Sequence, residues 1–197
     1  MSELKEKVWV IGEAIRTSFR RLRLETDYGR WGDCRSFSTD WDARTARLAR
    51  MIPPGSQVLE FGAGRMALKN YLPPGCSYTP SDLVDRGAGT IVCDLNGPEL
   101  PAFPPHDVAV FSGVLEYIHD VRSVVSHIGG LVATIVASYA IRERVSGRMT
   151  RRAQGWVNDL TSQQFEEVFA RAGFRHDLVE DWGNHKLYRF VRVAHAG

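Results

Sequence analysis

Residues 58–73 read VLEFGAGRMALKNYLP and combine a carboxylate with a glycine turn. Glu60 stands two residues before Gly62, and Gly62, Gly64 and Ala67 satisfy the pattern G-x-G-x-x-G/A. Glycines at these positions let the backbone turn sharply and approach a ligand, and a following helix offers free N–H groups to it. The motif alone is weak, because a tight turn in an ordinary sheet protein has the same glycines.

Two further carboxylates follow at the ends of apolar runs. Asp82 lies twenty residues after Gly62, where an acid can accept both hydrogen bonds of a ribose diol. Asp94 ends the next run in the same way, and helix capping is the alternative role for both. Glu60 would repel a pyrophosphate but suits a ligand that carries an ammonium and a sulfonium. The acid therefore argues against a nicotinamide dinucleotide.

The elements that must position these residues alternate along the chain. Apolar spacing predicts amphipathic helices over 4–23 and 41–52, and a later helix over 161–173 that Gly173 closes. Short apolar runs without strict polar alternation indicate strands buried on both faces of a parallel sheet. These runs span 57–61, 77–82, 89–94, 107–113 and 131–139, and two strand-like segments, 175–182 and 186–193, end the chain.

Composition limits the classes of function. With 197 residues and 44% hydrophobic content, the chain fits one globular domain. The net charge of +2 gives no strong overall field for nucleic acid, and no stretch has the length of a membrane span. Three widely separated cysteines show no zinc or disulfide spacing, so we expect no metal site and a reduced, cytoplasmic setting.

Taken together, the motifs resemble those of the class I S-adenosylmethionine-dependent methyltransferases of the small, Rossmann-like kind. The resemblance covers roughly residues 40–193 and rests on VLEFGAGR, YTPSDLV, CDLN, DVAVFSGVLEYIHD and WVNDLTSQQFEEVFARAGF, in that order. It implies an α/β three-layer sandwich with a Rossmann-like, mostly parallel seven-stranded sheet and one antiparallel strand from the terminal hairpin. Residues 39–197 would form the cofactor-binding domain, and residues 1–38 an N-terminal helical cap or lid.

The resemblance also implies roles for individual residues. It assigns the methionine part of S-adenosyl-L-methionine to Glu60, Gly62 and Gly64, the ribose to Asp82, the adenine to Asp94 with Cys93 or Leu95, and the wall beside the sulfonium to residues 112–115, including Ser112 and Gly113. The sequence departs from the family pattern at Met66, where a third glycine is common, and at Tyr117, where a histidine is expected. Tyr117 and His119 are the candidate bases, for which packing or surface positions are the alternative.

The acceptor is expected to be a small molecule methylated on oxygen or nitrogen. Five arginines against one glutamate give residues 141–156 a local charge of +4. We expect Arg148, Arg151 and Arg152 to hold a phosphate or carboxylate of the acceptor from a mobile lid, and a solvated charge run is the alternative. Nucleic acid is not favoured, since no motif interleaves aromatic and basic residues for stacking. A nicotinamide-dependent oxidoreductase and a cofactor-binding partner protein without activity remain alternatives, and the sequence leaves the oligomeric state open.

Overall fold

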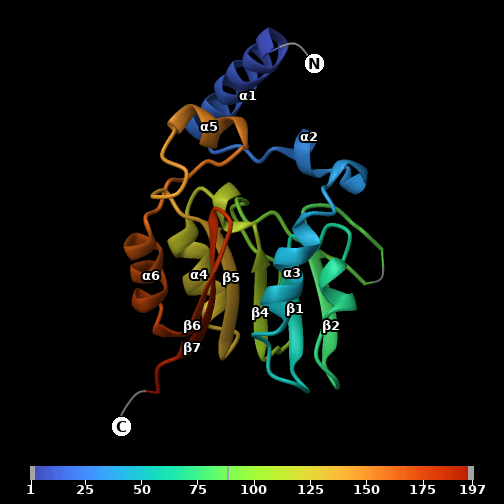
Figure 1. Ribbon diagram of the computed structural model, residues 1–197. Helices are drawn as coiled ribbons and strands as arrows, with labels where there is room; N and C mark the ends of the chain where they lie inside the picture. Colours follow the sequence, from blue (N-terminus) through green and yellow to red (C-terminus); the bar gives the residue numbers. More distant parts are fainter. Residues whose placement is uncertain (1–2, 88, 195–197) are drawn as a thin grey trace.

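A seven-stranded sheet with the order β3-β2-β1-β4-β5-β7-β6 forms the centre of the computed structural model, which describes residues 3–87 and 89–194 (Figure 1). β7 pairs antiparallel with both β5 and β6, and all other pairs are parallel. The predicted mostly parallel sheet with one antiparallel strand is therefore confirmed. The strands are β1 Gln57–Phe61, β2 Ser77–Asp82, β3 Ile91–Val92, β4 Val108–Ser112, β5 Thr134–Ala140, β6 Phe174–Trp182 and β7 His185–Arg192.

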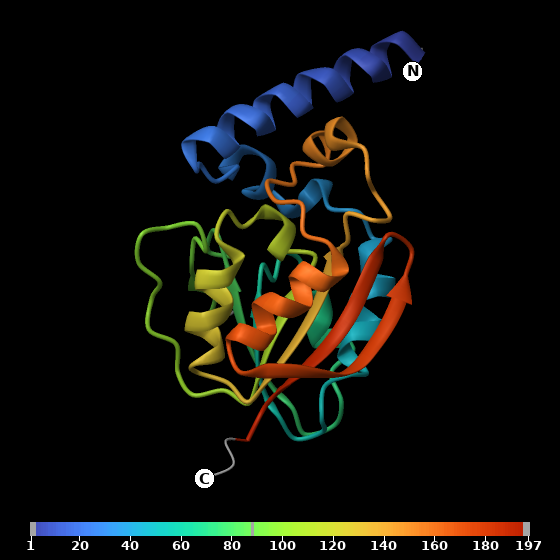
Figure 2. The ribbon, with the colours of Figure 1, turned by 90° about the vertical axis from the view of Figure 1, so that its left-hand side faces the viewer.

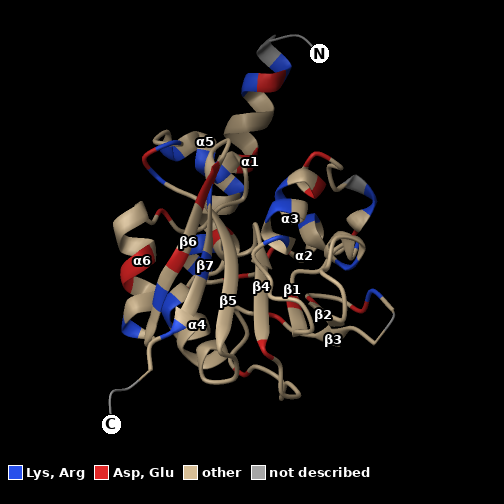
Figure 3. Ribbon diagram, turned by 60° about the horizontal axis from the view of Figure 1, so that its bottom comes forward, with Lys and Arg blue, Asp and Glu red and all other residues tan. Residues whose placement is uncertain are grey.

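The central strands are apolar throughout because both faces of the sheet are covered. Leu59 and Phe61 of β1 join one hydrophobic cluster, whereas Val58 of the same strand joins another on the opposite face. In Figure 3, β4 and β5 are almost entirely tan, and charged segments gather on the helices and on β6 and β7. Glu60 of β1 is an exception among these apolar residues, because it is an acid and yet buried.

Helices cover the two faces and complete three layers (Figures 1 and 2). α3 (Trp41–Ala49) packs on one face, and α4 (Val121–Gly129) and α6 (Ser162–Arg171) pack on the other. α6 begins with a capping box between Thr161 and Gln164, and Gly173 follows it with a φ of +83°. The three-layer α/β sandwich expected from the sequence is confirmed. The remaining short elements are α2 Tyr28–Trp31, α5 Arg148–Ala153, and the 3₁₀ turns η1 Cys34–Ser36, η2 Ala67–Asn70 and η3 Leu115–Tyr117.

The N-terminal segment lies at the carboxyl ends of the parallel strands. α1 (Glu3–Arg23) runs across the top of the molecule next to α5, and the chain then passes through α2 and η1 before it enters α3 (Figures 1 and 2). The helix predicted over residues 4–23 is confirmed. Within residues 3–87 and 89–194, no helix combines the length and the apolar character that crossing a membrane requires.

Candidate functional site

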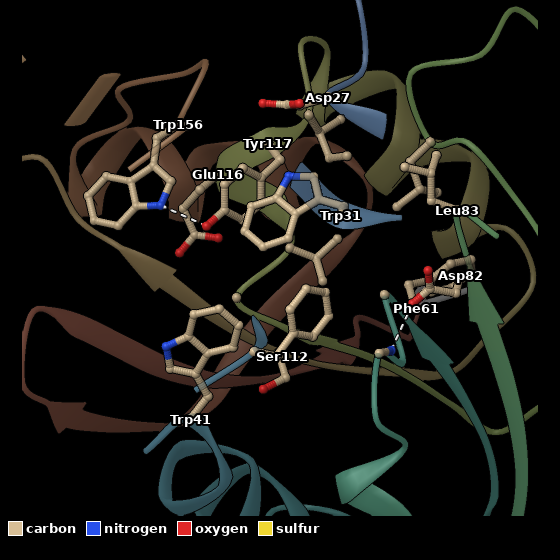
Figure 4. A pocket seen from close by; sticks show the side chains of 18 of the residues that line it. Asp27, Trp31, Trp41, Phe61, Asp82, Leu83, Ser112, Glu116, Tyr117 and Trp156 are labelled. Carbon is tan, nitrogen blue, oxygen red and sulfur yellow. Dashed lines mark hydrogen bonds between the residues drawn. The ribbon is translucent and has the colours of Figure 1, made fainter. Parts of the chain in front are cut away.

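A cavity of about 420 Å³ opens at the carboxyl ends of β1, β2 and β4 (Figure 4). In parallel α/β sheets this edge is where loops from neighbouring strands meet and ligands bind. The loops after these strands form its floor, and residues of α1, α2, α3 and the segment after α5 form its walls and roof. The predicted cofactor residues Glu60, Gly62, Gly64, Asp82, Asp94, Leu95, Ser112 and Gly113 all line it.

The glycine turn after β1 requires its glycines. Gly62 has a φ of +65° and Gly64 a φ of +52°, in the left-handed region that favours glycine. A Cβ on Gly62 would lie 2.6 Å from Cγ2 of Val114, and one on Gly64 would lie 3.0 Å from the ring of Phe37. Met66, which replaces a third glycine, also has a positive φ of 56°. Because Gly62 and Gly64 carry no side chains, the backbone of this turn stays accessible from the cavity.

Glu60 is buried beneath this turn. Its Oε2 accepts a hydrogen bond of 2.5 Å from the hydroxyl of Tyr78. Burial raises the pKa of the Glu60 carboxyl to about 8, and the nearby Asp82 carboxylate adds to the increase. The structure thus places at the cavity floor a carboxyl group that is close to its ionisation point at neutral pH.

Asp82 ties the glycine turn to the N-terminal segment. Its Oδ2 accepts 2.7 Å from the backbone N–H of Gly64, and its Oδ1 accepts 3.0 Å from Nη2 of Arg86. Arg86 also donates to the carbonyl oxygens of Trp31 and Gly32, at 2.5 Å and 2.6 Å. Both carboxylate oxygens therefore have partners, so a ribose bound here would share Asp82 with Arg86.

Asp94 makes a similar connection at the other side of the cavity. Its carboxylate accepts 2.8 Å from the hydroxyl of Thr26 and 3.1 Å from that of Tyr28. Asn96 then donates to the hydroxyl of Thr26 and to the carbonyl of Tyr117, at 3.1 Å and 3.0 Å. The predicted adenine end of the site is closed by the N-terminal segment.

Ser112 and Gly113, at the end of β4, contact a buried arginine of α3. Nη2 of Arg44 donates to the Ser112 carbonyl at 3.2 Å, and the hydroxyls of Ser112 and Thr45 share a hydrogen bond of 2.9 Å. A Cβ on Gly113 would lie 2.4 Å from the Arg44 guanidinium. Gly113, whose φ is +67°, therefore makes room for this side chain.

Arg44, Glu116 and His185 form a buried polar cluster that the sequence did not predict. Oε1 of Glu116 accepts 2.7 Å from the backbone N–H of Ala140, whereas Oε2 has no partner among the described residues. Nη1 of Arg44 lies 3.3 Å from Nε2 of His185. Burial, with the charges of Arg44 and Arg151, lowers the pKa of His185 to about 3. The imidazole is therefore neutral at pH 7. Its Nε2 lies near both a donor, Arg44, and an acceptor, Oε1 of Glu116 at 3.5 Å, and the tautomer that accepts from Arg44 carries its proton on Nδ1.

Aromatic rings make up much of the rest of the cavity wall. Trp31 packs edge-on against Tyr117 with ring centroids 4.5 Å apart, and Phe37 and Trp41 continue this group. Nε1 of Trp156 donates to the hydroxyl of Tyr117 at 3.2 Å (Figure 4). These flat, mostly apolar surfaces give the cavity the character of a small-molecule site.

The structure places the two bases predicted from the sequence, Tyr117 and His119, differently with respect to the cavity. Tyr117 lines the cavity, but burial and the Glu116 carboxylate raise the pKa of its hydroxyl, which makes it a poor base at neutral pH. His119 is not among the lining residues. Its backbone N–H donates to Oδ1 of Asn96 at 2.8 Å, and its Nε2 lies 3.3 Å from the carbonyl of Glu25. His119 stands behind the cavity because the turn after η3 directs it toward the N-terminal segment.

Two of the three arginines expected to bind the acceptor from a mobile lid are buried. Arg151 and Arg152 are 1% and 3% exposed, and both pair with Asp159. Nη1 of Arg151 donates 3.0 Å to the carbonyl of Ala140, so this side chain fixes the segment to the end of β5. Arg148 is exposed and does not line the cavity. Arg151 and Arg152 are thus structural, because their carboxylate partner Asp159 stands seven or eight residues farther along the chain.

Solved structures of methyltransferases resemble this chain in fold. No protein-family model and no curated protein matches the sequence. A methyltransferase of calicheamicin biosynthesis, solved with S-adenosylhomocysteine, matches with a TM-score of 0.60 and 19% identity over 77% of this chain and 54% of its own. The Burkholderia thailandensis 1,6-didemethyltoxoflavin-N1-methyltransferase, solved with its substrate and S-adenosylhomocysteine, matches with a TM-score of 0.60 and 18% identity over 98% of this chain and 91% of its own.

A third match is an O-methyltransferase of neocarzinostatin biosynthesis in complex with S-adenosylmethionine and 2-hydroxy-5-methyl naphthoic acid. Its TM-score is 0.61, with 15% identity over 85% of this chain and 60% of its own. The chain has the fold of the S-adenosylmethionine-dependent methyltransferases. It spans only about half the length of the calicheamicin enzyme. The methyltransferase fold explains why the glycine turn, Asp82 and the end of β4 meet at one edge of the sheet.

Three residues of the polar cluster in this fold were not predicted from the sequence. Arg44 and His185 come from α3 and the start of β7, far from the recognised motifs. Glu116 lies inside a recognised motif but was passed over for its neighbour Tyr117. Among the described residues, no group of three histidine, cysteine or acidic side chains could hold a metal ion.

Proposed function

We propose that this protein binds S-adenosyl-L-methionine in the cavity and transfers its methyl group to an oxygen or nitrogen of a small-molecule acceptor. The glycine turn carries the proposal, because it keeps a backbone surface open at the carboxyl end of β1 where side chains cannot fit. The shared fold supports the same function, since its solved neighbours are O- and N-methyltransferases.

The charge of the lining favours a cationic cofactor. Seven carboxyl groups and four guanidinium groups border the cavity. Arg20, Arg65 and Arg86 each already pair with an acid, at 2.7 Å, 2.7 Å and 3.0 Å. A pyrophosphate would find no free cation among these three. Burial raises the pKa values of Glu60 and Glu116, and the other five carboxylates still outnumber the four guanidinium groups, which favours a sulfonium and an ammonium. The lining therefore favours S-adenosylmethionine over a nicotinamide dinucleotide.

The residues present fit this cofactor. Gly62, Gly64 and Glu60 would hold its methionine part, Asp82 its ribose, and Asp94 with Leu95 its adenine. Ser112 and Gly113 would face the sulfonium, and bound there the cofactor supplies an activated methyl group. The chain's own contribution is to align the acceptor with that methyl and to exclude water by means of the N-terminal segment and the aromatic wall.

We assign the uptake of the acceptor's proton to Glu116. Burial raises the pKa of its carboxyl and the Arg44 guanidinium opposes the increase, and a carboxyl whose pKa is raised toward neutrality is a stronger base in its ionised form. Its Oε2 is buried and unpartnered, so a hydroxyl or amine N–H of the acceptor would supply the missing hydrogen-bond donor. As the acceptor atom bonds to the methyl carbon, its proton would pass to Oε2 of Glu116 while the C–S electron pair stays on sulfur. Neutral His185 would offer its Nδ1–H, which also has no partner, to an acceptor oxygen.

The acceptor that fits these walls is flat and uncharged. Trp31, Trp41 and Trp156 present ring surfaces. Of the arginines expected to bind an anion, Arg151 and Arg152 are buried in pairs with Asp159, and Arg148 does not line the cavity. The toxoflavin and neocarzinostatin enzymes are solved with planar ligands, which agrees with a flat acceptor; the absence of charge rests only on the lining of the cavity. A phosphate-bearing acceptor is accordingly not part of the proposal.

Binding and turnover test the proposal separately. Calorimetry should detect S-adenosylhomocysteine binding and no comparable binding of NADH. A panel of one-, two- and three-ring phenols and aromatic amines is then assayed for S-adenosylhomocysteine release. NADH binding without S-adenosylhomocysteine binding would favour an oxidoreductase, and cofactor binding without turnover of any compound would favour the inactive binding protein.

The role of Glu116 is tested with the acceptor that gives the fastest turnover. Glu116→Gln should lower kcat roughly a hundredfold and leave S-adenosylhomocysteine affinity unchanged, since general-base catalysis contributes about that factor or more. Glu167→Gln, an exposed glutamate on α6, is the matched control and should behave as the wild type. If Glu116→Gln kept the wild-type kcat, Glu116 would not be the base, and the chain would contribute only by aligning the acceptor with the methyl group.

A further inference from the structure

The outer face of α1 exposes a continuous apolar stripe. Its members recur at intervals of three or four residues and therefore lie on one side of the helix. They are between 45% and 82% exposed: Val8, Ile11, Ile15, Phe19 and Leu22. Soluble monomers rarely leave a contiguous patch of large apolar side chains in water without a partner.

The opposite face of α1 holds the helix on the protein. Ala14 and Thr17 are buried there, and α1 packs along α5. Ion pairs from Arg20 to Asp27 and from Arg30 to Glu13 join this face to the segment around α2. In Figure 2, α1 runs across the top of the molecule with no other element above it. The stripe therefore faces outward from a helix that is already fixed in place.

Basic side chains border the stripe on both sides. Helical spacing places Lys5, Arg16 and Arg23 along one border and Lys7 along the other, and all four are exposed. The acids Glu6 and Glu13 fall on the far side of the helix, where Glu13 pairs with Arg30 as well as Arg16. Trp9, 55% exposed, lies beyond the basic side chains of the first border.

This charge pattern decides between the possible occupants. Two copies of α1 packed stripe to stripe would bring basic borders together, and like charges facing across an interface oppose association. An anionic lipid surface complements both features, because apolar side chains enter the acyl boundary while lysine and arginine reach the headgroups. Tryptophan and phenylalanine are also favoured at that depth.

We propose that α1 binds the surface of an anionic phospholipid bilayer and lies in its plane. The helix would extend about 32 Å along the surface at 1.5 Å per residue. This inference does not depend on methyl transfer. It has one consequence for the cavity: Thr17 and Arg20, on the inner face of α1, line it, so docking would hold the cavity directly beneath the membrane surface.

Vesicle flotation with the full chain tests the proposal. The protein should float with phosphatidylcholine vesicles that contain phosphatidylglycerol and remain unbound with phosphatidylcholine alone. Ile15→Ser combined with Phe19→Ser should weaken binding roughly tenfold or more, because two large apolar groups are withdrawn from the lipid. The matched control is Leu178→Ser combined with Val179→Ser, whose 40% and 39% exposed side chains lie on β6, and it should bind like the wild type.

The contribution of the basic side chains to lipid binding is tested by a variant that combines Lys5→Gln, Lys7→Gln and Arg23→Gln. This variant should bind anionic vesicles several-fold more weakly and lose most of the salt dependence of binding. All variants change exposed side chains, so each should melt at the wild-type temperature. Absence of vesicle binding, or equal binding of the Ile15/Phe19 variant, would overturn the proposal. A concentration-dependent dimer that the same variant abolishes, with no vesicle binding, would identify a second copy as the occupant instead.

Discussion

Glu60 should make the folded state less stable as pH rises through neutrality. Its carboxyl is 3% exposed, and burial raises its pKa from 4.5 to about 8 in the folded chain. Between these two values the folded chain keeps the proton and the unfolded chain releases it. Because the folded state binds more protons in this window, the free energy of unfolding falls with increasing pH.

The size of the effect follows from the two pKa values. Linkage gives a loss of about 3 kcal/mol between pH 5 and pH 8 from this group alone. Glu60→Gln removes the titration but keeps a carbonyl oxygen that can accept the hydrogen bond from Tyr78. The variant should therefore lack this part of the pH dependence and should be the more stable protein at pH 8.

Urea unfolding of both proteins at several pH values from 5 to 8 measures the difference. Subtracting the two curves cancels the titration of all other groups, which the proteins share. The difference should grow steadily with pH. Parallel curves would show that Glu60 ionises normally in the folded state and would refute the assignment of a buried, protonated carboxyl beneath the glycine turn.

Three further outcomes are expected. Asp159→Ala should lower the free energy of unfolding by about 3 kcal/mol, since it leaves two buried guanidinium groups unpaired; Asp177→Ala, which breaks a more exposed pair, should cost less than about 1 kcal/mol in the same urea titration. Gly62→Ala should lower S-adenosylhomocysteine affinity roughly tenfold by calorimetry, through backbone strain and a clash beside the cavity. Gly183 also has a positive φ, of +53°, but has open space around it, so Gly183→Ala should bind normally, and equal affinities in the two variants would contradict the role of the turn. His119→Ala should keep turnover within about twofold of the wild type, because its ring lies outside the cavity, and a large loss of kcat would restore it as a candidate base.

Local sequence determined the fold and the cofactor end of the site. The runs 57–61 and 107–113 have no polar alternation because both faces of their strands are buried, and that composition alone indicates a parallel sheet. Gly62 and Gly64 could be recognised because the turn requires positive φ angles, a property of the residue type itself. Asp82 and Asp94 followed from their positions at the ends of apolar runs, since the carboxyl ends of parallel strands meet at one edge.

Tertiary structure decided which side chains share the acceptor side. Arg44, Glu116 and His185 come from three separate elements, and no spacing along the chain connects them. Arg151 and Arg152 looked like a free basic run until the chain folded back and brought Asp159 to both of them. Whether a charge is free, paired or buried depends on contacts between distant segments. The residue types therefore set the fold and the turn, and only the packed structure determined the protonation states and partners on which the chemistry depends.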